Sequence, residues 1–485
     1  MATRRATVVG SGPNGLSAAV VLARAGFEVT VLEAQDGIGG GTRTAQLTLP
    51  GFRHDVCSAV HPAALTSPFF QAFGMREKIG WLVPDASYAH PLDGGRAAVA
   101  WRDIGRTAHE LGVDAGAWKA MLRPLSRRIE GVVDFTGHQM LRVPRHPVTG
   151  VRFGLRALEL GTALGRHSFR SEEAQALISG VIAHANTRLP TVGAAAAGLL
   201  LASQAHADGW GYPVGGAQAI PDALADDLHA HGGRIVTRHR VDDLSTLDWG
   251  DPERGDVVVL DAPPRLALTL PDVPAHWARA IRSYRYGPGA AKVDFALDGD
   301  VPWTNPDVRR SPTVHVCGTR AEVEASENAV ARGRISERPY VLTVQPSVLD
   351  PTRAPQGKSV LWTYIHVPPN STFDATEVIT RQIERFAPGF RDRILASHAT
   401  TAVEHAEENP SSIGGDYAGG AVSFGQLIAR PLLSTAPWRT PMKGVYLASA
   451  STPPGPGVHG TAGWEAARLA IADTTGERVE LGDLF

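Results

Sequence analysis

RATVVGSGPNGLSAAVVLARAGFEVTVLEAQDGIGGGTRT, residues 5–44, is the segment around which the rest of this chain is organised. It opens with the apolar run Ala6–Val9, which is too short for a helix and rich in β-branched residues, so it predicts a buried strand. Gly10-Ser-Gly12-Pro-Asn-Gly15 follows directly and has the GxGxxG pattern. In that pattern the first glycine permits a tight turn, the second lets the backbone approach a pyrophosphate, and the third lets a helix lie close to the strand. The segment therefore predicts a dinucleotide-binding βαβ unit.

The residues after the glycines complete this unit. Asn14–Ala25 is small and apolar and predicts a helix whose free N–H groups and dipole point at the phosphates. Glu28–Leu32 predicts a second buried strand, and Glu33 stands at its end. An acid at this position can accept both ribose hydroxyls of an adenosine and would repel a 2′-phosphate. The motif therefore favours a dinucleotide without that phosphate.

A second glycine cluster, Gly37–Thr44, lies just beyond the acid. Many domains that bind only NAD enter a crossover connection at this point. A second backbone approach to a diphosphate is more typical of FAD held in an extended form. The order of strand, glycines, helix, strand, acid and second glycine cluster therefore predicts FAD.

With this GxGxxG…E…GG beginning, the sequence resembles the superfamily of FAD-dependent amine oxidases and phytoene desaturases. In that superfamily a PGF…D…S stretch follows the second glycine cluster and leads towards the isoalloxazine ring. Pro50-Gly51 here predicts a hairpin turn, and Asp55 and Ser58 match the superfamily pattern.

Two further blocks carry the resemblance. Residues 210–262 are similar to the segment that returns to the FAD domain, and there the resemblance implies a backbone contact between Val241 and adenine. Residues 340–473 end in a strand, a Gly-Pro loop and a helix, as the superfamily's closing motif does, although Ser449 replaces its usual glycine. The match is close to the phytoene-dehydrogenase-related branch, which includes pyridine nucleotide-disulfide oxidoreductase domain-containing proteins.

Composition narrows the class of protein. Lys and Arg total 47 and Asp and Glu total 49, so the formal net charge of −2 gives no electrostatic basis for binding nucleic acid. The two cysteines, Cys57 and Cys317, form no CxxC pattern, and no HExxH occurs, so neither a dithiol nor a metal site is expected. The first residues run straight into a strand, which leaves no room for a signal peptide, and no apolar stretch is long enough for a membrane span. These features predict a cytoplasmic protein.

The fold class expected is α/β, with a Rossmann-like FAD-binding domain and a discontinuous α+β substrate domain that combines a mixed sheet with a helical insert. The FAD-binding domain is expected to comprise residues 1–100, 206–285 and 431–485. The substrate domain is expected to comprise the helical residues 101–205 and the strand-rich residues 286–430.

The expected site follows from the motifs and the resemblance together. The residues expected to bind FAD are Gly10, Gly12, Pro13, Asn14, Gly15, Glu33, Ala34, Gly39, Gly40, Gly41, Thr42, Ser58, Val241, Ala450, Gly457, Val458 and His459. Our hypothesis is that residues 457–459 lie against the flavin pyrimidine, because glycines let the backbone approach a ring closely and a helix begins just beyond them. His459 is the ionisable side chain of this loop and the first candidate for catalysis.

The function expected is an FAD-dependent oxidoreductase that removes hydride from, and so desaturates, a lipophilic or small organic substrate, as phytoene desaturases do. A redox-neutral isomerase and an amine oxidase are the alternatives. A reductase linked to a pyridine nucleotide would want a second GxGxxG and usually a dithiol, and both are absent from the sequence. The partner expected is a small, apolar substrate. Peripheral membrane contact stays open, although no basic amphipathic helix is evident in the sequence, and the oligomeric state stays open as well.

Overall fold

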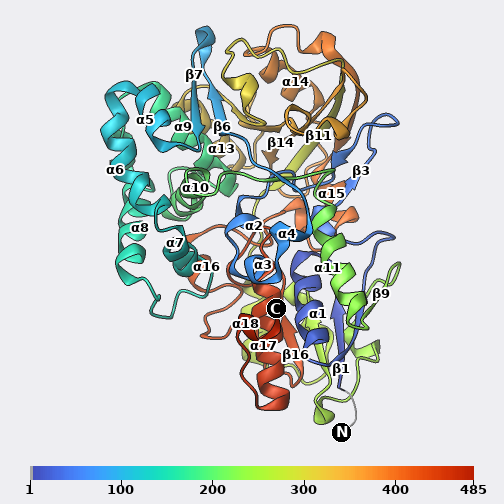
Figure 1. The fold of residues 1–485 in the computed structure, drawn as a ribbon. Coiled ribbons are helices and arrows are strands. Elements are labelled where there is room, and N and C mark those ends of the chain that lie inside the picture. The colour runs from blue at the N-terminus through green and yellow to red at the C-terminus, as the bar shows by residue number, and fades with distance from the viewer. Residues whose placement is uncertain (1–3) are drawn as a thin grey trace.

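The computed structural model describes residues 4–485 and contains two main sheets, one at each end of the molecule (Figure 1). The first is a five-stranded parallel sheet in the order β16-β10-β1-β2-β9. Its strands are β1 (Arg5–Val9), β2 (Glu28–Leu32), β9 (Arg234–Val236), β10 (Val257–Leu260) and β16 (Val445–Leu447). The chain therefore leaves this sheet after β2 and returns to it twice, as a discontinuous domain requires.

Helices cover both faces of the parallel sheet, which explains why its strands are valine-rich on both sides. On one face, Val8 and Val31 pack with α1 (Pro13–Arg24), α11 (Ala219–Ala230) and α17 (Thr461–Thr475). On the other face, Val258 and Leu260 pack with α12 (Ala275–Ser283). The helix and strand predicted after the glycines are confirmed.

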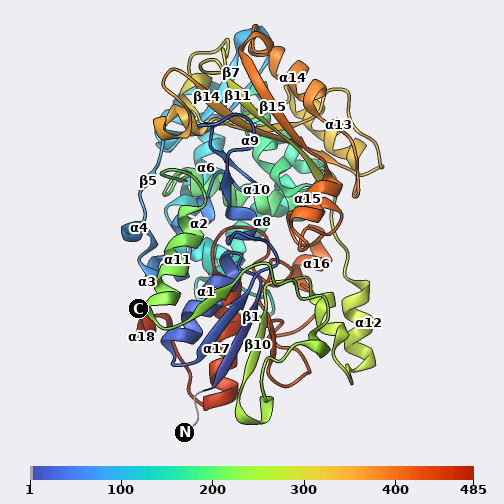
Figure 2. The same cartoon turned by 90° about the vertical axis from the view of Figure 1, so that its right-hand side faces the viewer.

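The second sheet has seven strands in the order β15-β11-β14-β13-β12-β6-β7 and lies at the top of Figures 1 and 2. Its strands are β6 (Ala86–Pro91), β7 (Ala97–Trp101), β11 (Gly289–Leu297), β12 (Thr313–Val316), β13 (Val341–Val344), β14 (Ser359–Val367) and β15 (Ile394–Thr400). Along β14, alternate residues separate by face: Leu361 and Ile365 join a core with α14 (Thr376–Glu384), whereas Trp362 and Tyr364 join the core on the opposite face. This is the period-two alternation of a strand.

The sheets correct one predicted domain boundary. Residues 86–101 form β6 and β7, which pair within the seven-stranded sheet and not with the parallel one. The boundary placed at residue 100 is therefore wrong, because β12 from the distal half of the chain supplies the pairing partner of β6.

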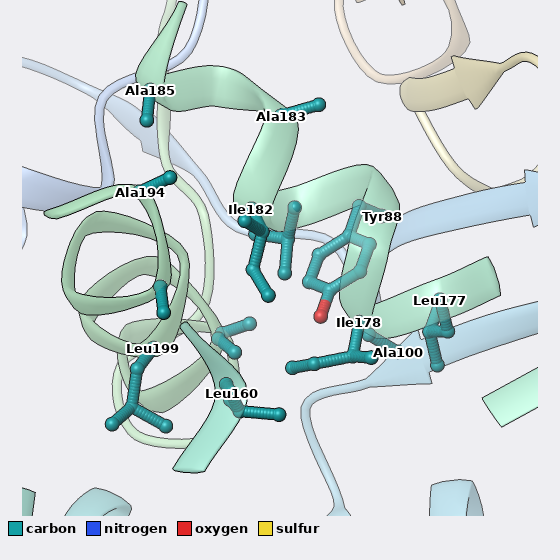
Figure 3. Close-up of a cluster of buried hydrophobic side chains, with 14 of the residues drawn as sticks. Tyr88, Ala100, Leu160, Leu177, Ile178, Ile182, Ala183, Ala185, Ala194 and Leu199 are labelled. Carbon is teal, nitrogen blue, oxygen red and sulfur yellow. The ribbon is translucent and has the colours of Figure 1, made fainter. Parts of the chain in front are cut away.

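A layer of helices stands beside the seven-stranded sheet, as the periodicity of residues 101–205 predicts. It comprises α5 (Ile104–Glu110), α6 (Ala115–Ser126), α7 (Ile129–Thr136), α8 (Pro147–Leu160), α9 (Glu172–Ile182) and α10 (Val192–Ala205). Figure 3 shows Leu160 of α8, Ile182 of α9 and Leu199 of α10 converging beside Tyr88 of β6. Among the described helices, none has the length and apolar character that crossing a membrane requires.

Short elements connect these layers. The predicted hairpin around Pro50-Gly51 is present as β3 (Thr44–Ala45) and β4 (His54–Asp55). The others are α2 (Pro62–Thr66), α3 (Pro68–Phe73), α4 (Met75–Lys78), β5 (Trp81–Leu82), β8 (Tyr212–Pro213), α13 (Arg320–Val330), α15 (Ala402–Glu408), α16 (Phe424–Ile428) and α18 (Leu481–Leu484).

Candidate functional site

A cavity of about 1030 Å³ extends from the carboxyl edge of the parallel sheet to the inner face of the seven-stranded sheet. At one end it is lined by the ends of β1, β2 and β10, and at the other by side chains of β11, β13 and β14. Ligands of open α/β sheets bind outside the carboxyl ends of the strands, so this cavity is the candidate site.

The first glycine turn is packed so closely that side chains are excluded. Gly10 has φ +99°, and a Cβ there would lie 2.5 Å from the carbonyl oxygen of Asp261. A Cβ on Gly12 would lie 2.5 Å from the carboxylate of the same aspartate, and one on Gly15 would collide with the carbonyl oxygen of Gly10. The turn therefore presents bare backbone to the cavity, which suits a diphosphate.

Glu33 lies at the end of β2 and is held by the same turn. Its Oε2 accepts hydrogen bonds from the Ser11 backbone N–H at 2.9 Å and from Ser11 Oγ at 2.5 Å, and its Oε1 accepts one from the Gln35 N–H at 2.8 Å. A carboxylate can accept about four hydrogen bonds, so capacity for a ribose hydroxyl remains. The motif thus orients its acid before any ligand arrives.

Asp261, which follows β10, is a site residue that the motif did not indicate. Its Oδ2 accepts the Gly15 N–H at 2.9 Å, directly beneath the glycine turn. Burial, with a smaller contribution from Glu33, raises the pKa of this carboxyl to about 7. A protonated Asp261 can lie beside a diphosphate without the repulsion that a carboxylate would cause.

The second glycine cluster packs against the first. The Gly39 N–H donates to the Ser11 carbonyl at 3.0 Å, and a Cβ on Gly40 would lie 3.3 Å from the Gly12 Cα. Gly39 has φ +113°, and a Cβ there would lie 2.8 Å from the Pro221 side chain. The two clusters therefore form one double-layered backbone wall at this end of the cavity.

The closing loop brings a second helix N-terminus to the cavity. Gly463 lies against the Asn14 carbonyl so closely that no side chain would fit, which lets α17 cross α1 near the start of both helices. Asn14 and Thr461, in the first turns of the two helices, both line the cavity. Both helix dipoles therefore favour negative charge there.

His459 has both ring nitrogens occupied within its own loop. The Thr461 N–H donates to Nδ1 at 3.1 Å, and Nε2 donates to the Gly455 carbonyl at 3.2 Å. Burial lowers the pKa of His459 to about 4, so the ring is neutral. The geometry favours a role in holding the loop over the predicted role in catalysis, because neither nitrogen is free to exchange a proton with a ligand.

Most of the residues expected to bind FAD line this one cavity. They are Gly10, Gly12, Pro13, Asn14, Glu33, Ala34, Gly40, Gly41, Thr42, Ser58, Val241, Ala450, Gly457, Val458 and His459. Gly15 and Gly39 do not line it, and their close contacts make them supports of the wall. Residues more than 400 positions apart in the sequence thus meet at one surface.

At the far end of the cavity a chain of buried polar groups leads away from its wall. Tyr364 and Tyr417 line the cavity with their hydroxyl oxygens 3.2 Å apart. The Tyr417 hydroxyl lies 3.2 Å from His366 Nε2, and His366 Nδ1 lies 2.8 Å from Glu327 Oε2. Burial raises the pKa of the Tyr417 phenol well above its usual range, so the hydroxyl carries its proton. The period-two alternation placed Tyr364 and His366 on one face, but Tyr417 and Glu327 come from other elements and no local pattern marked them.

Lys292 of β11 is a second polar residue of this wall that sequence reasoning missed. It is buried, pairs with Asp294, and its ammonium lies 5.9 Å from the centre of the Trp362 ring. Burial raises the pKa of Asp294 to about 6. Lys292 and Tyr364 are directly opposed on adjacent strands, so the sheet register fixes both at the cavity.

Several buried polar atoms at the cavity have no hydrogen-bond partner within residues 4–485. They are Asn14 Oδ1, His61 Nε2, Gln204 Oε1 and the indole nitrogen of Trp362. Buried polar groups in native proteins are normally paired, so unpaired ones facing a cavity indicate a ligand with donors and acceptors. The donor set, the backbone wall and the two helix N-termini together fit FAD.

This arrangement defines an FAD-dependent oxidoreductase: a dinucleotide site built on a parallel sheet opens into an apolar chamber under a mixed sheet. The chain belongs to the flavin containing amine oxidoreductase family, whose model matches residues 14–471. The superfamily resemblance, the fold class and the cofactor expected from the sequence are confirmed.

Relatives and solved structures agree with this assignment. The chain is 26% identical to rat pyridine nucleotide-disulfide oxidoreductase domain-containing protein 2, over 96% of this chain and 93% of that one. It is 23% identical to a neurosporene-forming phytoene desaturase of Rhodobacter capsulatus, over 94% and 91%. Cyclohexylamine oxidase from Brevibacterium oxydans shares the fold with a TM-score of 0.58, at 16% identity over 98% of this chain and 99% of that one.

Proposed function

We propose that this enzyme dehydrogenates a small apolar molecule, removing a hydride and a proton. The observation that carries the proposal is the apolar wall of the cavity beyond the glycine clusters. Its members include Phe135, Phe153, Ala197, Leu200, Val422 and Leu427. Such a wall gains free energy by taking apolar surface out of water, about 25 cal/mol for each Å².

The residues that would hold FAD are those of the two glycine clusters, Glu33, Val241 and residues 457–459. When bound, FAD supplies the hydride acceptor. Residues 206–285 and 431–485, together with the chain before β6, make up its domain in this proposal. The apolar wall of the cavity excludes water from the substrate bond that reacts.

We assign removal of the substrate proton to Tyr417, acting directly or through Tyr364. A Glu327 carboxylate fixes the hydrogen of His366 on Nδ1, which leaves Nε2 free to accept from the Tyr417 hydroxyl. Tyr417 can therefore take a proton from the substrate, directly or through Tyr364, as it passes its own to His366. Glu327 then stabilises the imidazolium. This is the arrangement by which a buried carboxylate supports a histidine base.

Redox-neutral isomerisation is a second candidate, because the same tyrosine could return its proton to a different carbon. Amine oxidation is the third, and the solved structures of amine oxidases share the fold. The phytoene desaturase of Rhodobacter capsulatus matches 94% of the chain in sequence at 23% identity, whereas the amine oxidases match in fold at 16% identity, which supports dehydrogenation over amine oxidation.

Anaerobic mixing of the flavin-loaded enzyme with phytoene in detergent, and separately with cyclohexylamine, tests the proposal. Loss of the visible flavin absorbance with phytoene is expected. Conversion of phytoene with no bleaching and no electron acceptor would identify an isomerase, and bleaching by the amine alone would identify an amine oxidase. Either result would overturn dehydrogenation of an apolar molecule.

We propose the cytoplasm as the compartment of this protein. The free thiols of Cys57 and Cys317 are compatible with a reducing compartment. Fluorescence microscopy of the tagged full chain tests this. An apolar substrate also dissolves in lipid, so the proposal includes peripheral contact with a membrane.

A further inference from the structure

The helix α8 exposes a stripe of apolar side chains. Val148, Val151, Leu155 and Leu158 have exposed fractions of 70%, 63%, 62% and 51%. Their spacing of three and four residues puts them along one side of the helix. The opposite side, with Phe153, Ala157 and Leu160, is buried against the neighbouring helices, and Figure 3 shows Leu160 in that cluster. α8 is therefore apolar on two sides, and only one of them packs in the protein.

Basic side chains border the exposed stripe. Residues 138–158 contain four arginines and no Asp or Glu. Arg145 and Arg152 are exposed, and neither forms an ion pair with any acid in the part of the chain that the structure describes. Arg152 is next to Val151, and Arg145 just precedes the helix. Long basic side chains can lay their stems along an apolar surface while their charged ends reach outward.

The stripe adjoins the open part of the cavity. Met140, in the loop before α8, and Phe424, at the start of α16, line the cavity and have exposed fractions of 38% and 58%. Helices α8 and α16 both pack on α10, and Figure 1 shows them on the same side of the molecule. Met140 and Phe424 therefore connect the cavity lining with the outer surface on the side of the molecule where α8 lies.

We propose that the surface formed by residues 140–158 and Phe424, here named the α8 surface, docks on an anionic lipid bilayer. The apolar stripe inserts at the level of the headgroups, the arginines bind lipid phosphates, and the cavity opens towards the acyl chains. The lipid is favoured over a second copy of this chain because Arg145 and Arg152 border the stripe without a pairing acid, and two such surfaces would bring like charges face to face. The proposal rests on the proposed function in one respect, which is that an apolar substrate gives such a contact its purpose.

The sequence analysis found no basic amphipathic helix, and the proposal differs from it by giving that character to α8. The pattern escapes notice because α8 is apolar on both its buried and its exposed sides. Only burial against α7 and α10 distinguishes the two.

Flotation of the full-length, FAD-loaded protein with vesicles tests the proposal. One set of vesicles is phosphatidylcholine alone, and the other is an equal mixture with phosphatidylglycerol. Binding to the anionic vesicles is expected, with weak or no binding to the neutral ones. Removing both charges in Arg145→Gln/Arg152→Gln should weaken binding about fivefold for each arginine. Val151→Glu/Leu155→Glu should weaken it by about tenfold or more.

The matched control is Leu395→Glu, which puts a carboxylate at an exposed apolar position of β15 in the distant sheet and should leave vesicle binding unchanged. Flavin absorbance of each variant verifies that it is folded. Equal binding to both kinds of vesicle, or none to either, would overturn the proposal. So would a wild-type dimer, seen by light scattering, that Val151→Glu/Leu155→Glu dissociates. Flotation needs neither substrate nor turnover, so it tests the α8 surface independently of the proposed function. If the protein binds anionic vesicles but phytoene does not bleach the flavin, the proposed function is rejected and the proposal for the α8 surface is retained.

Discussion

His366 Nδ1 lies 2.8 Å from Glu327 Oε2, and both side chains are shielded from solvent. The pair joins β14 to α13, and its outward nitrogen faces the hydroxyl of Tyr417 at the cavity wall. A carboxylate hydrogen-bonded to one nitrogen of an imidazole fixes the tautomer and the orientation of the ring. In the proposed mechanism this relationship positions the hydroxyl of Tyr417, on the loop that follows α15, as an acid–base group.

We expect Tyr417→Phe to slow substrate-dependent bleaching of the flavin by about 10²-fold or more, because the proton acceptor is lost. Stopped-flow absorbance across a range of pH values measures this. Glu327→Gln should change the pH profile, since the histidine loses its counter-charge, while flavin content stays the same. Tyr340→Phe is the matched control, because its hydroxyl donates to the Gly180 carbonyl away from the cavity. A Tyr417→Phe enzyme with the wild-type rate and pH profile would remove the tyrosine from the mechanism.

Glu33→Ala should weaken retention of FAD. The acid accepts from Ser11 and remains able to accept from ribose, and each hydrogen bond to a charged acceptor contributes about 1.5–3 kcal/mol. Fluorescence titration of the apoprotein with FAD gives the change in Kd. Asp36→Ala removes a nearby exposed carboxylate and should have little effect. Equal FAD affinity in Glu33→Ala and wild type would show that the acid serves only the glycine turn.

Asp261→Asn should flatten the pH dependence of stability. The native carboxyl, with its pKa raised to about 7, keeps its proton where the unfolded chain has released it, so the native state binds more protons from about pH 4 to 7. The free energy of unfolding of the apoprotein therefore falls as pH rises through that window, by up to about 1.4 kcal/mol per pH unit from this group. Urea unfolding at several pH values measures the slope.

The same aspartate should affect cofactor binding. Above pH 7 its carboxylate would repel the diphosphate, so the Kd for FAD should rise in the wild type and stay level in Asp261→Asn. If the Kd for FAD depends on pH in the same way in the wild type and in Asp261→Asn, Asp261 is not the group whose charge repels the diphosphate.

His459→Ala should reduce FAD retention and thermal stability more than it alters the chemistry of bound flavin. Both ring nitrogens hold the closing loop, and two hydrogen bonds contribute about 1–3 kcal/mol together. The enzyme should also show no titration of His459 near pH 6.5, because burial lowers its pKa to about 4. A variant that keeps its flavin and its melting temperature but loses turnover would restore His459 as a catalytic candidate.

NADH and NADPH should not bleach the flavin at a useful rate. The described chain has one parallel sheet with a glycine turn of this kind, and a reductase needs a second nucleotide site. Anaerobic stopped-flow mixing with each nucleotide is the measurement. Bleaching within seconds would contradict the expectation.

The sequence alone determined the nucleotide half of this protein. Gly10, Gly12, Gly15 and Glu33 lie within one βαβ unit, where local sterics leave few alternatives to a tight turn, a helix start and an acid at the strand end. The second glycine cluster and the closing loop were expected from the resemblance to the superfamily, together with the freedom of glycine to let backbone approach a ligand closely.

The substrate half depended on tertiary contacts. Glu327, His366 and Tyr417 come from a helix, a strand and a loop, and no spacing along the chain predicts that their polar atoms meet within hydrogen-bond distance. The raised pKa of Asp261 and the tied ring of His459 are likewise products of burial, which the sequence does not display. In the sequence, the apolar residues on one side of α8 cannot be distinguished from those on the other side. They differ only because α7 and α10 cover one side and leave the other to solvent, and that is decided by packing.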